Sequence, residues 1–153
     1  MDIHEFKYIG EPKTSLGMRV LPENFVLTKN SEPVWNIRYI RFGRKFYIEP
    51  VNGDAITFHK RWFFLELRDL VVNGQKQCSF FHKATKIGAT KLWVDSRSFI
   101  YLGNEKICSI DPWTPNWPGD NLTFYKWEHS NTELELKINI LALMAAVDYA
   151  DRY

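Results

Sequence analysis

The sequence offers little that would place the protein in an oxidising compartment or in a membrane. Only two cysteines, Cys78 and Cys108, occur in 153 residues. Each lies in an apolar, strand-like run, so we expect buried thiols rather than a disulfide framework. No apolar run approaches the roughly 20 residues that a membrane-spanning helix needs, and Met1–Glu5 is too polar for a signal peptide. These absences predict an intracellular, cytoplasmic protein that contacts a membrane only peripherally, if at all.

Catalytic and metal-binding motifs are also missing. The chain has no Gly-x-Ser-x-Gly, P-loop, dinucleotide-binding or His-Glu-x-x-His pattern. Its histidines, His4, His59, His82 and His129, show no spacing typical of a metal site. The acidic segment 128–135 lacks the spaced ligands and the glycine of an EF-hand loop. A pairing of either cysteine with a histidine stays open, although a strand cysteine is more often an inert apolar residue. We therefore expect no enzyme, no cofactor and no metal.

Charge is distributed unevenly along the chain. Residues 1–91 contain 15 Lys and Arg against 9 Asp and Glu, whereas residues 92–153 contain 5 against 9. The first part is therefore net basic and the second net acidic. This asymmetry favours a basic face formed by the first part, and an evenly solvated surface is the plainer alternative.

Short apolar runs, rich in aromatic residues and about ten residues apart, predict a mainly antiparallel β fold. Hairpins are expected over 25–37, 46–58, 63–81 and 99–110, with single strands at 92–94 and 122–127. Asn52-Gly53 and Asn73-Gly74 are strong hairpin-turn signals. Residues 1–18 are interpreted as an irregular leader or an edge strand. Residues 111–119 hold three prolines and are expected to form a long loop.

One helix is expected near the C-terminus, over residues 133–149. Every residue from Ile140 to Val147 is apolar, so a helix there would be apolar on all sides and must be surrounded by protein. Thr132 and Glu135 have the spacing of a capping box. Leu134, Leu136, Ile138 and Ile140 alternate, so a beginning as a strand stays open. Asp148 directly follows the apolar run and lies either at a solvated mouth or, if buried, beside a partner such as Arg152.

Taken together, these patterns predict a single domain over residues 1–153: a closed antiparallel β-barrel of about ten strands that encloses the hydrophobic helix. A lipocalin-like barrel is less consistent with them, because its helix packs on the outside and needs only one apolar face.

The chain resembles the tubby C-terminal-like, LURP-one-related and phospholipid scramblase superfamily. The resemblance lies in the repeated strand, Asn-Gly-type turn and strand over residues 24–110. It lies also in the ending Leu134-Glu-Leu-Lys137 and Ala145-Ala-Val-Asp-Tyr149, which is similar to the lead-in and the closing Ile-Asp-Phe-like tripeptide of scramblase-like proteins. This resemblance implies a β-barrel threaded by its C-terminal helix and the binding of phosphoinositides. The palmitoylatable cysteine cluster and proline-rich N-terminal region of scramblases are not found, which argues against scramblase activity.

Two candidate binding surfaces follow. Basic loops are expected to bind an anionic phospholipid head group through Arg44, Lys45, Lys60, Arg61, Lys83 and Lys86. Solvated strand-edge charges, or less readily a nucleic-acid surface, are the alternatives. The second surface is the loop with Trp113 and Trp117, which would contact a protein partner or a membrane, unless both indoles plug one end of the barrel.

Overall fold

A computed structural model describes residues 1–10, 14–15, 18–19, 22–40, 45–61, 64–81, 92–94, 99–112 and 122–152. Within these ranges, residues 14–15, 18–19, 60–61, 64–68, 79–81, 110–112 and 147–152 are described by their backbone alone. The elements are β1 (Asp2–Tyr8), β2 (Thr14–Ser15), β3 (Met18–Arg19), β4 (Asn24–Lys29), β5 (Glu32–Ile40), β6 (Lys45–Pro50), β7 (Ile56–Arg61), β8 (Phe64–Val72), β9 (Gln75–Phe81), β10 (Leu92–Val94), β11 (Phe99–Leu102), β12 (Glu105–Pro112), β13 (Thr123–His129) and α1 (Glu135–Arg152).

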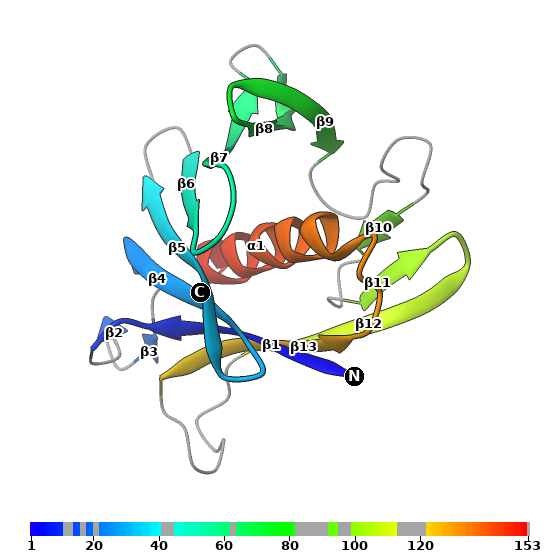
Figure 1. Ribbon diagram of the computed structural model, residues 1–153. Coiled ribbons are helices and arrows are strands. Elements are labelled where there is room, and N and C mark those ends of the chain that lie inside the picture. Colours follow the sequence, from blue (N-terminus) through cyan, green and yellow to red (C-terminus); the bar gives the residue numbers. More distant parts are fainter. Residues whose placement is uncertain are drawn as a thin grey trace.

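Eleven of the described strands form one antiparallel sheet in the order β10-β11-β12-β13-β1-β4-β5-β6-β7-β8-β9. Most neighbours in this sheet are also neighbours in the chain. The exception is the pairing of β1 with both β13 and β4, which joins the two halves of the meander. β2 and β3 form a separate two-stranded sheet. Figure 1 shows the large sheet curling around α1, with β1 and β13 on one side and β7 to β9 on the other.

The expected hairpins are confirmed. β4–β5, β6–β7, β8–β9 and β11–β12 pair as the sequence predicts. At the β8–β9 turn, Asn73 and Gly74 have φ of 51° and 77°, the left-handed conformations that a tight two-residue hairpin turn needs and that Asn and Gly adopt most readily. The short-range rules therefore succeeded for these four hairpins, whereas the pairings of β10 with β11 and of β12 with β13 were not predicted.

The prediction for the first residues is wrong. Asp2–Tyr8 is neither irregular nor an edge strand, because it pairs with β13 over Asp2–Lys7 and with β4 over His4–Tyr8. Both of its edges are therefore hydrogen-bonded. Its inward side chains, Phe6 and Tyr8, belong to the core, and Phe6 packs edge-on against Trp127 of β13 at 4.7 Å between ring centroids.

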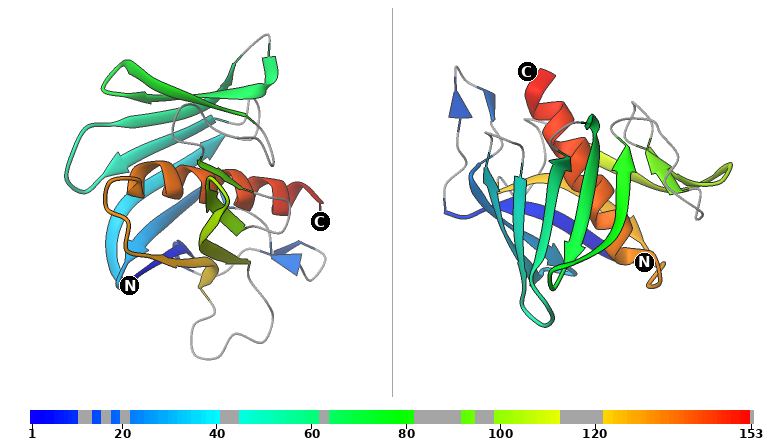
Figure 2. Two further views of the ribbon diagram at one scale, coloured as in Figure 1. Left: turned by 90° about the vertical axis from the view of Figure 1, so that its right-hand side faces the viewer. Right: turned by 90° about the horizontal axis from the view of Figure 1, so that it is seen from above.

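The inner face of the sheet and the helix form one core. Burial alternates along β5, where Trp35, Ile37 and Tyr39 are buried and the residues between them are exposed. In α1, Ile138 and all residues from 140 to 146 are buried. This confirms that the helix is surrounded by protein. Figure 2 shows it with strands above and below, and the Tyr125 hydroxyl of β13 donates a 3.1 Å hydrogen bond to the Ala145 carbonyl.

The helix begins at Glu135 and ends at Arg152, close to the expected 133–149, and shows no strand at its start. The described sheet is not a closed barrel, because no ladder joins its outer strands β9 and β10. In the described part of the chain, no helix is both long and apolar enough to cross a membrane.

Candidate functional site

Four elements converge at one end of the sheet and bring together side chains that are far apart in sequence. His4 of β1 pairs with Lys29, the last residue of β4, and with Trp127 of β13. His129 is the last residue of β13, and Glu135 is the first residue of α1. We call His4, Lys29, His129 and Glu135 the histidine cluster.

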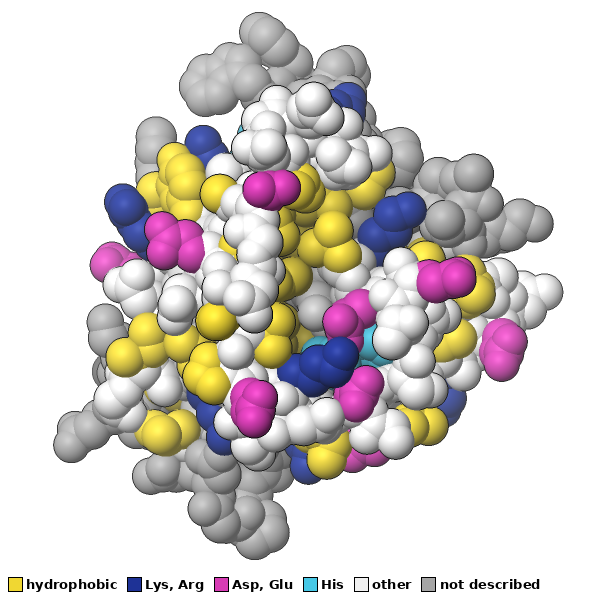
Figure 3. Space-filling view, viewed as in Figure 1, with side chains coloured by type: hydrophobic (Ala, Val, Ile, Leu, Met, Phe, Trp, Pro, Cys, Tyr) yellow, Lys and Arg dark blue, Asp and Glu magenta, His cyan; other side chains and the backbone are white. Residues whose placement is uncertain are grey.

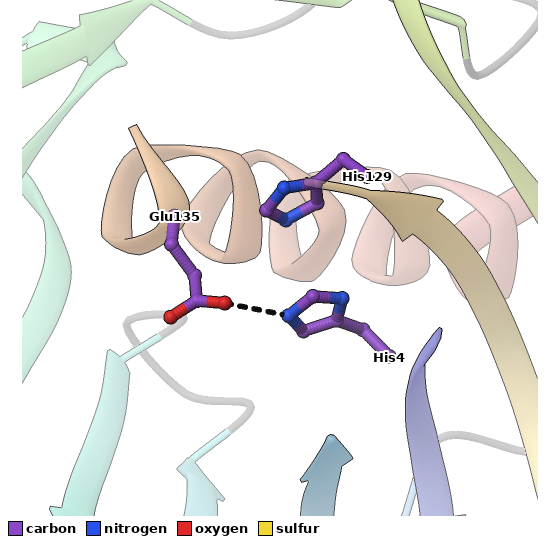
Figure 4. A group of neighbouring side chains, drawn as sticks. All are labelled: His4, His129 and Glu135. Atoms are coloured by element: carbon purple, nitrogen blue, oxygen red, sulfur yellow. Dashed lines mark hydrogen bonds and ion pairs between the residues drawn. The ribbon is translucent and has the colours of Figure 1, made fainter. Parts of the chain in front are cut away.

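The side chains of the histidine cluster are in direct contact. The His4 Nε2 atom lies 3.0 Å from Glu135 Oε1, and the Lys29 Nζ atom lies 2.8 Å from the same oxygen. The imidazole rings of His4 and His129 stack at 4.5 Å between centroids, with 5° between their planes. Figure 4 shows the two rings one above the other, with Glu135 beside them. Both histidines are buried, whereas Glu135 and Lys29 are partly exposed.

Two ring nitrogens of the histidine cluster lack a hydrogen-bond partner in the described part of the chain. A carboxylate only accepts, so His4 Nε2 carries the proton that it donates to Glu135. The Nδ1 atom of His129 accepts the backbone N–H of Asn131 at 3.2 Å, which places the ring proton of neutral His129 on Nε2. His4 Nδ1 and His129 Nε2 are buried and, like His59 Nδ1 elsewhere in the sheet, have no hydrogen-bond partner among the described residues. Buried polar atoms of this kind are rare in folded proteins and call for an explanation.

The electrostatics of the cluster indicate the charges of Lys29, His129 and Glu135. Burial, with a further contribution from His4, lowers the pKa of His129 to about 4, so this imidazole is neutral at pH 7. Burial acts to raise the pKa of Glu135, but the hydrogen bonds from Lys29 and His4 outweigh it and lower that pKa. The hydrogen bond to Glu135 raises the pKa of Lys29. The cluster therefore combines a carboxylate, an ammonium group and a neutral imidazole.

The expected capping box is wrong. The Leu134 backbone N–H donates to Asn131 Oδ1 at 3.0 Å, and Ile138 N–H donates to the Leu134 carbonyl as the first intrahelical bond. Asn131 thus caps this end, as asparagine commonly does. The Glu135 side chain is instead engaged by His4 and Lys29.

The predicted basic residues are partly brought together. Lys45 is the first residue of β6, and Lys60 and Arg61 are the last two of β7. These strand ends lie side by side, because Phe46 pairs with Phe58. Arg38 pairs with Tyr47, and Arg68 pairs with Lys60. We call this set the basic end; its members are Arg38, Lys45, Lys60, Arg61 and Arg68. The predicted Arg44, Lys83, Lys86, Trp113 and Trp117 lie outside the described residues, and the Asp148 side chain is not described.

The side chains that are described at the basic end surround an exposed tyrosine. The Lys45 Nζ atom lies 4.6 Å and the Arg38 Cζ atom 5.6 Å from the centroid of the Tyr47 ring. Among the described residues, the acidic ones at this end are Glu23, whose carbonyl accepts the Tyr39 N–H, Glu66 of β8 and Asp69, which pairs with Lys76. The five basic residues of the basic end outnumber these three.

The histidine cluster is the site that the sequence did not reveal. His4 and His129 lie near opposite ends of the sequence, and the β1–β13 pairing brings them together. One feature of the sequence could have indicated the cluster. His4 lies two residues before Phe6 and four before Tyr8, and His129 lies two residues after Trp127, so each histidine lies on the core-facing side of its strand.

The cysteines show no sign of catalysis. Cys108 is buried, and burial raises its pKa to about 12. Cys78 is half-buried, and burial raises its pKa as well. A reactive cysteine needs a lowered pKa, so neither thiol has the character of a nucleophile.

Comparison of the chain with models of protein families, with curated proteins and with solved structures finds no match.

Proposed function

We propose that this protein is a non-enzymatic binding module that engages anionic phospholipid head groups through the basic end. The observation that carries the proposal is the strand register, which collects Arg38, Lys45, Lys60, Arg61 and Arg68 on four adjacent strands, β5 to β8. A phosphoinositide head group carries several negative charges on a small area. Clustered Lys and Arg side chains are the usual partners of such a group.

The exposed Tyr47 fits a membrane surface. Tyrosine is enriched at the level of lipid head groups, because its ring is apolar and its hydroxyl is polar. Here the Arg38 and Lys45 side chains both lie over the ring. Each basic residue near an anionic surface contributes about 1 kcal/mol of binding free energy, and the contribution falls within a Debye length. The basic residues of this end that face solvent would therefore supply moderate, salt-sensitive binding.

The architecture supports a relationship with the tubby-like superfamily as part of the same proposal. A meander that wraps around one apolar C-terminal helix is the arrangement that the resemblance implies. The strand order becomes a ring if β9 and β10, which are consecutive in the chain, lie next to each other. In this proposal the sheet closes there and the domain is a closed barrel.

Liposome co-sedimentation tests the binding. Phosphatidylcholine vesicles are compared with vesicles that also contain a phosphoinositide, at low and at high salt. We expect binding to the second vesicles alone, lost at high salt. The variant Lys45→Gln/Arg61→Gln should bind about thirtyfold more weakly, because two contributions of about 1 kcal/mol are removed.

The matched control is Lys106→Gln/Lys126→Gln, which removes the same charge from β12 and β13, away from the basic end. It should bind as the unchanged protein does. If both variants bound the vesicles equally weakly, net charge rather than the basic end would explain the binding. No binding to either vesicle would remove the proposal and turn attention to a protein partner of the Trp113–Trp117 loop.

A further inference from the structure

The histidine cluster contains a set of metal ligands assembled from three separate elements. His4, His129 and Glu135 each offer one ligand atom, and these atoms lie within 4.8 Å of one another. They come from β1, from the end of β13 and from the start of α1. In Figure 4 both nitrogens of His129 lie on the side of its ring that faces Glu135.

We propose that His4, His129 and Glu135 bind a divalent transition metal ion of the zinc type. Two imidazoles and one carboxylate form a donor set that suits zinc, whereas calcium and magnesium prefer oxygen ligands alone. The unpartnered nitrogen of His129 supports the proposal independently of the clustering. His129 is 3% exposed, and its Nε2 atom has no hydrogen-bond partner among the described residues. Binding of a metal ion to His129 Nε2 moves the ring proton to Nδ1, so the hydrogen bond from the Asn131 N–H must break.

The distances require a modest contraction. Zinc binds nitrogen at about 2.0–2.1 Å, so two ligands of a tetrahedral site lie about 3.4 Å apart. His4 Nε2 and Glu135 Oε1 are already 3.0 Å apart. The other distances between ligand atoms are at most 4.8 Å, so they must shorten by at most about 1.4 Å. The partly exposed Glu135 side chain can rotate toward the ion. The two stacked imidazole rings, whose planes lie 5° apart, must also turn toward a common point.

Lys29 would compete with a metal ion for Glu135. Its ammonium group lies 2.8 Å from Glu135 Oε1 and 3.7 Å from Asp2 Oδ2. A metal ion that binds Glu135 must displace this ammonium group, which then remains beside Asp2. Glu135, Lys29 and Asp2 are all partly exposed, so the ion has a path from solvent and water can occupy the fourth position.

The face drawn in Figure 3 agrees with this access. A histidine side chain is visible there between basic and acidic side chains, on the side of the molecule where Figure 1 shows the N-terminus and the end of β13. A bound ion would link the first strand, the last strand and the helix, so that metal binding would stabilise the closing contacts of the fold.

The test is titration of the purified, chelator-treated full chain with Zn²⁺ and, as a spectroscopic probe, with Co²⁺. We expect one ion per chain in calorimetry and the visible absorption of tetrahedral Co²⁺. The ring ¹⁵N resonances of two of the four histidines should shift in NMR spectra, and these should be His4 and His129. Zn²⁺ at about a hundredfold excess over its dissociation constant should raise the thermal unfolding midpoint.

Three variants sharpen the test. Glu135→Gln removes a ligand with little change in shape and should weaken Zn²⁺ binding at least about tenfold. Glu133→Gln removes an exposed carboxylate two residues away and is the matched control, expected to leave affinity unchanged. Lys29→Met removes the competing ammonium group and should tighten binding.

The site would be supported by three results together. Zn²⁺ should bind more weakly to Glu135→Gln, more tightly to Lys29→Met and with unchanged affinity to Glu133→Gln. The proposal would be overturned by the absence of stoichiometric binding in the unchanged protein. It would equally be overturned if Glu135→Gln and Glu133→Gln bound alike, or if the shifted resonances belonged to His59 and His82. The unchanged protein alone decides two of these outcomes, so a variant that fails to fold does not block the test.

Discussion

Truncating a leucine at the centre of the helix gives the most direct test of how the fold is held together. Leu143 of α1 is 0% exposed, and Leu143→Ala removes three carbon atoms from the core. At about 0.8 kcal/mol for each buried carbon, the transfer contribution is about 2.4 kcal/mol. The cavity left among the strands raises the expected loss of unfolding free energy to about 3–5 kcal/mol.

Urea denaturation followed by tryptophan fluorescence measures this loss. The midpoint should fall with little change in the slope, because the surface exposed on unfolding is nearly the same. In a thermal scan, the unfolding midpoint should fall by about 6–20 °C. The expected loss is a large fraction of the 5–15 kcal/mol that holds a typical domain together.

Leu136→Ala is the matched control, because it makes the same change in the same helix at a half-buried position. Its loss should be less than half as large, since part of that side chain already contacts water. Equal losses for the two variants, or a loss below about 1 kcal/mol for Leu143→Ala, would contradict the placement of the helix inside the sheet.

Three further predictions concern single residues. Tyr125→Phe removes the hydroxyl that donates to the Ala145 carbonyl, and urea denaturation should show a loss of about 1–2 kcal/mol; no loss would mean that this bond does not hold the helix. Burial raises the pKa of the Cys108 thiol from its ordinary 9.0 to about 12. At pH 8 its thiolate fraction, and with it its rate of labelling by a disulfide reagent, should be about a thousandfold below that of the urea-unfolded chain. Gly74→Ala places a Cβ at a φ of 77° and should cost about 1 kcal/mol in the same denaturation assay.

Much of the sheet is encoded locally and was therefore accessible from the sequence. Asn73-Gly74 specifies a turn whichever strands flank it, and the alternation of Trp35, Ile37 and Tyr39 identifies the inner face of β5. The helix was equally accessible, because an all-round apolar segment must be enclosed by protein. In these cases the residues that specify an element lie within that element or within a few positions of it.

The place of β1 was not accessible in this way. Asp2–Tyr8 has the alternation of a strand, but nothing within the segment specifies that β13 and β4 are its partners. The histidine cluster depends on that same pairing, so it was missed for the same reason. The basic end was found in part, because Lys45, Lys60 and Arg61 belong to consecutive strands that a hairpin joins.

The strand order also constrains the sequence of events during synthesis. β1 is made first, yet one of its two partners, β13, is made last among the strands. The hairpins from β4 to β9 can form as they leave the ribosome, because their partners are adjacent in the chain. Their apolar inner faces, however, have nothing to pack against until α1 follows. Non-local closure of this kind is slow, and uncovered strands aggregate. We therefore expect the hairpins to remain prone to aggregation until the eighteen residues of α1 are available to pack against them.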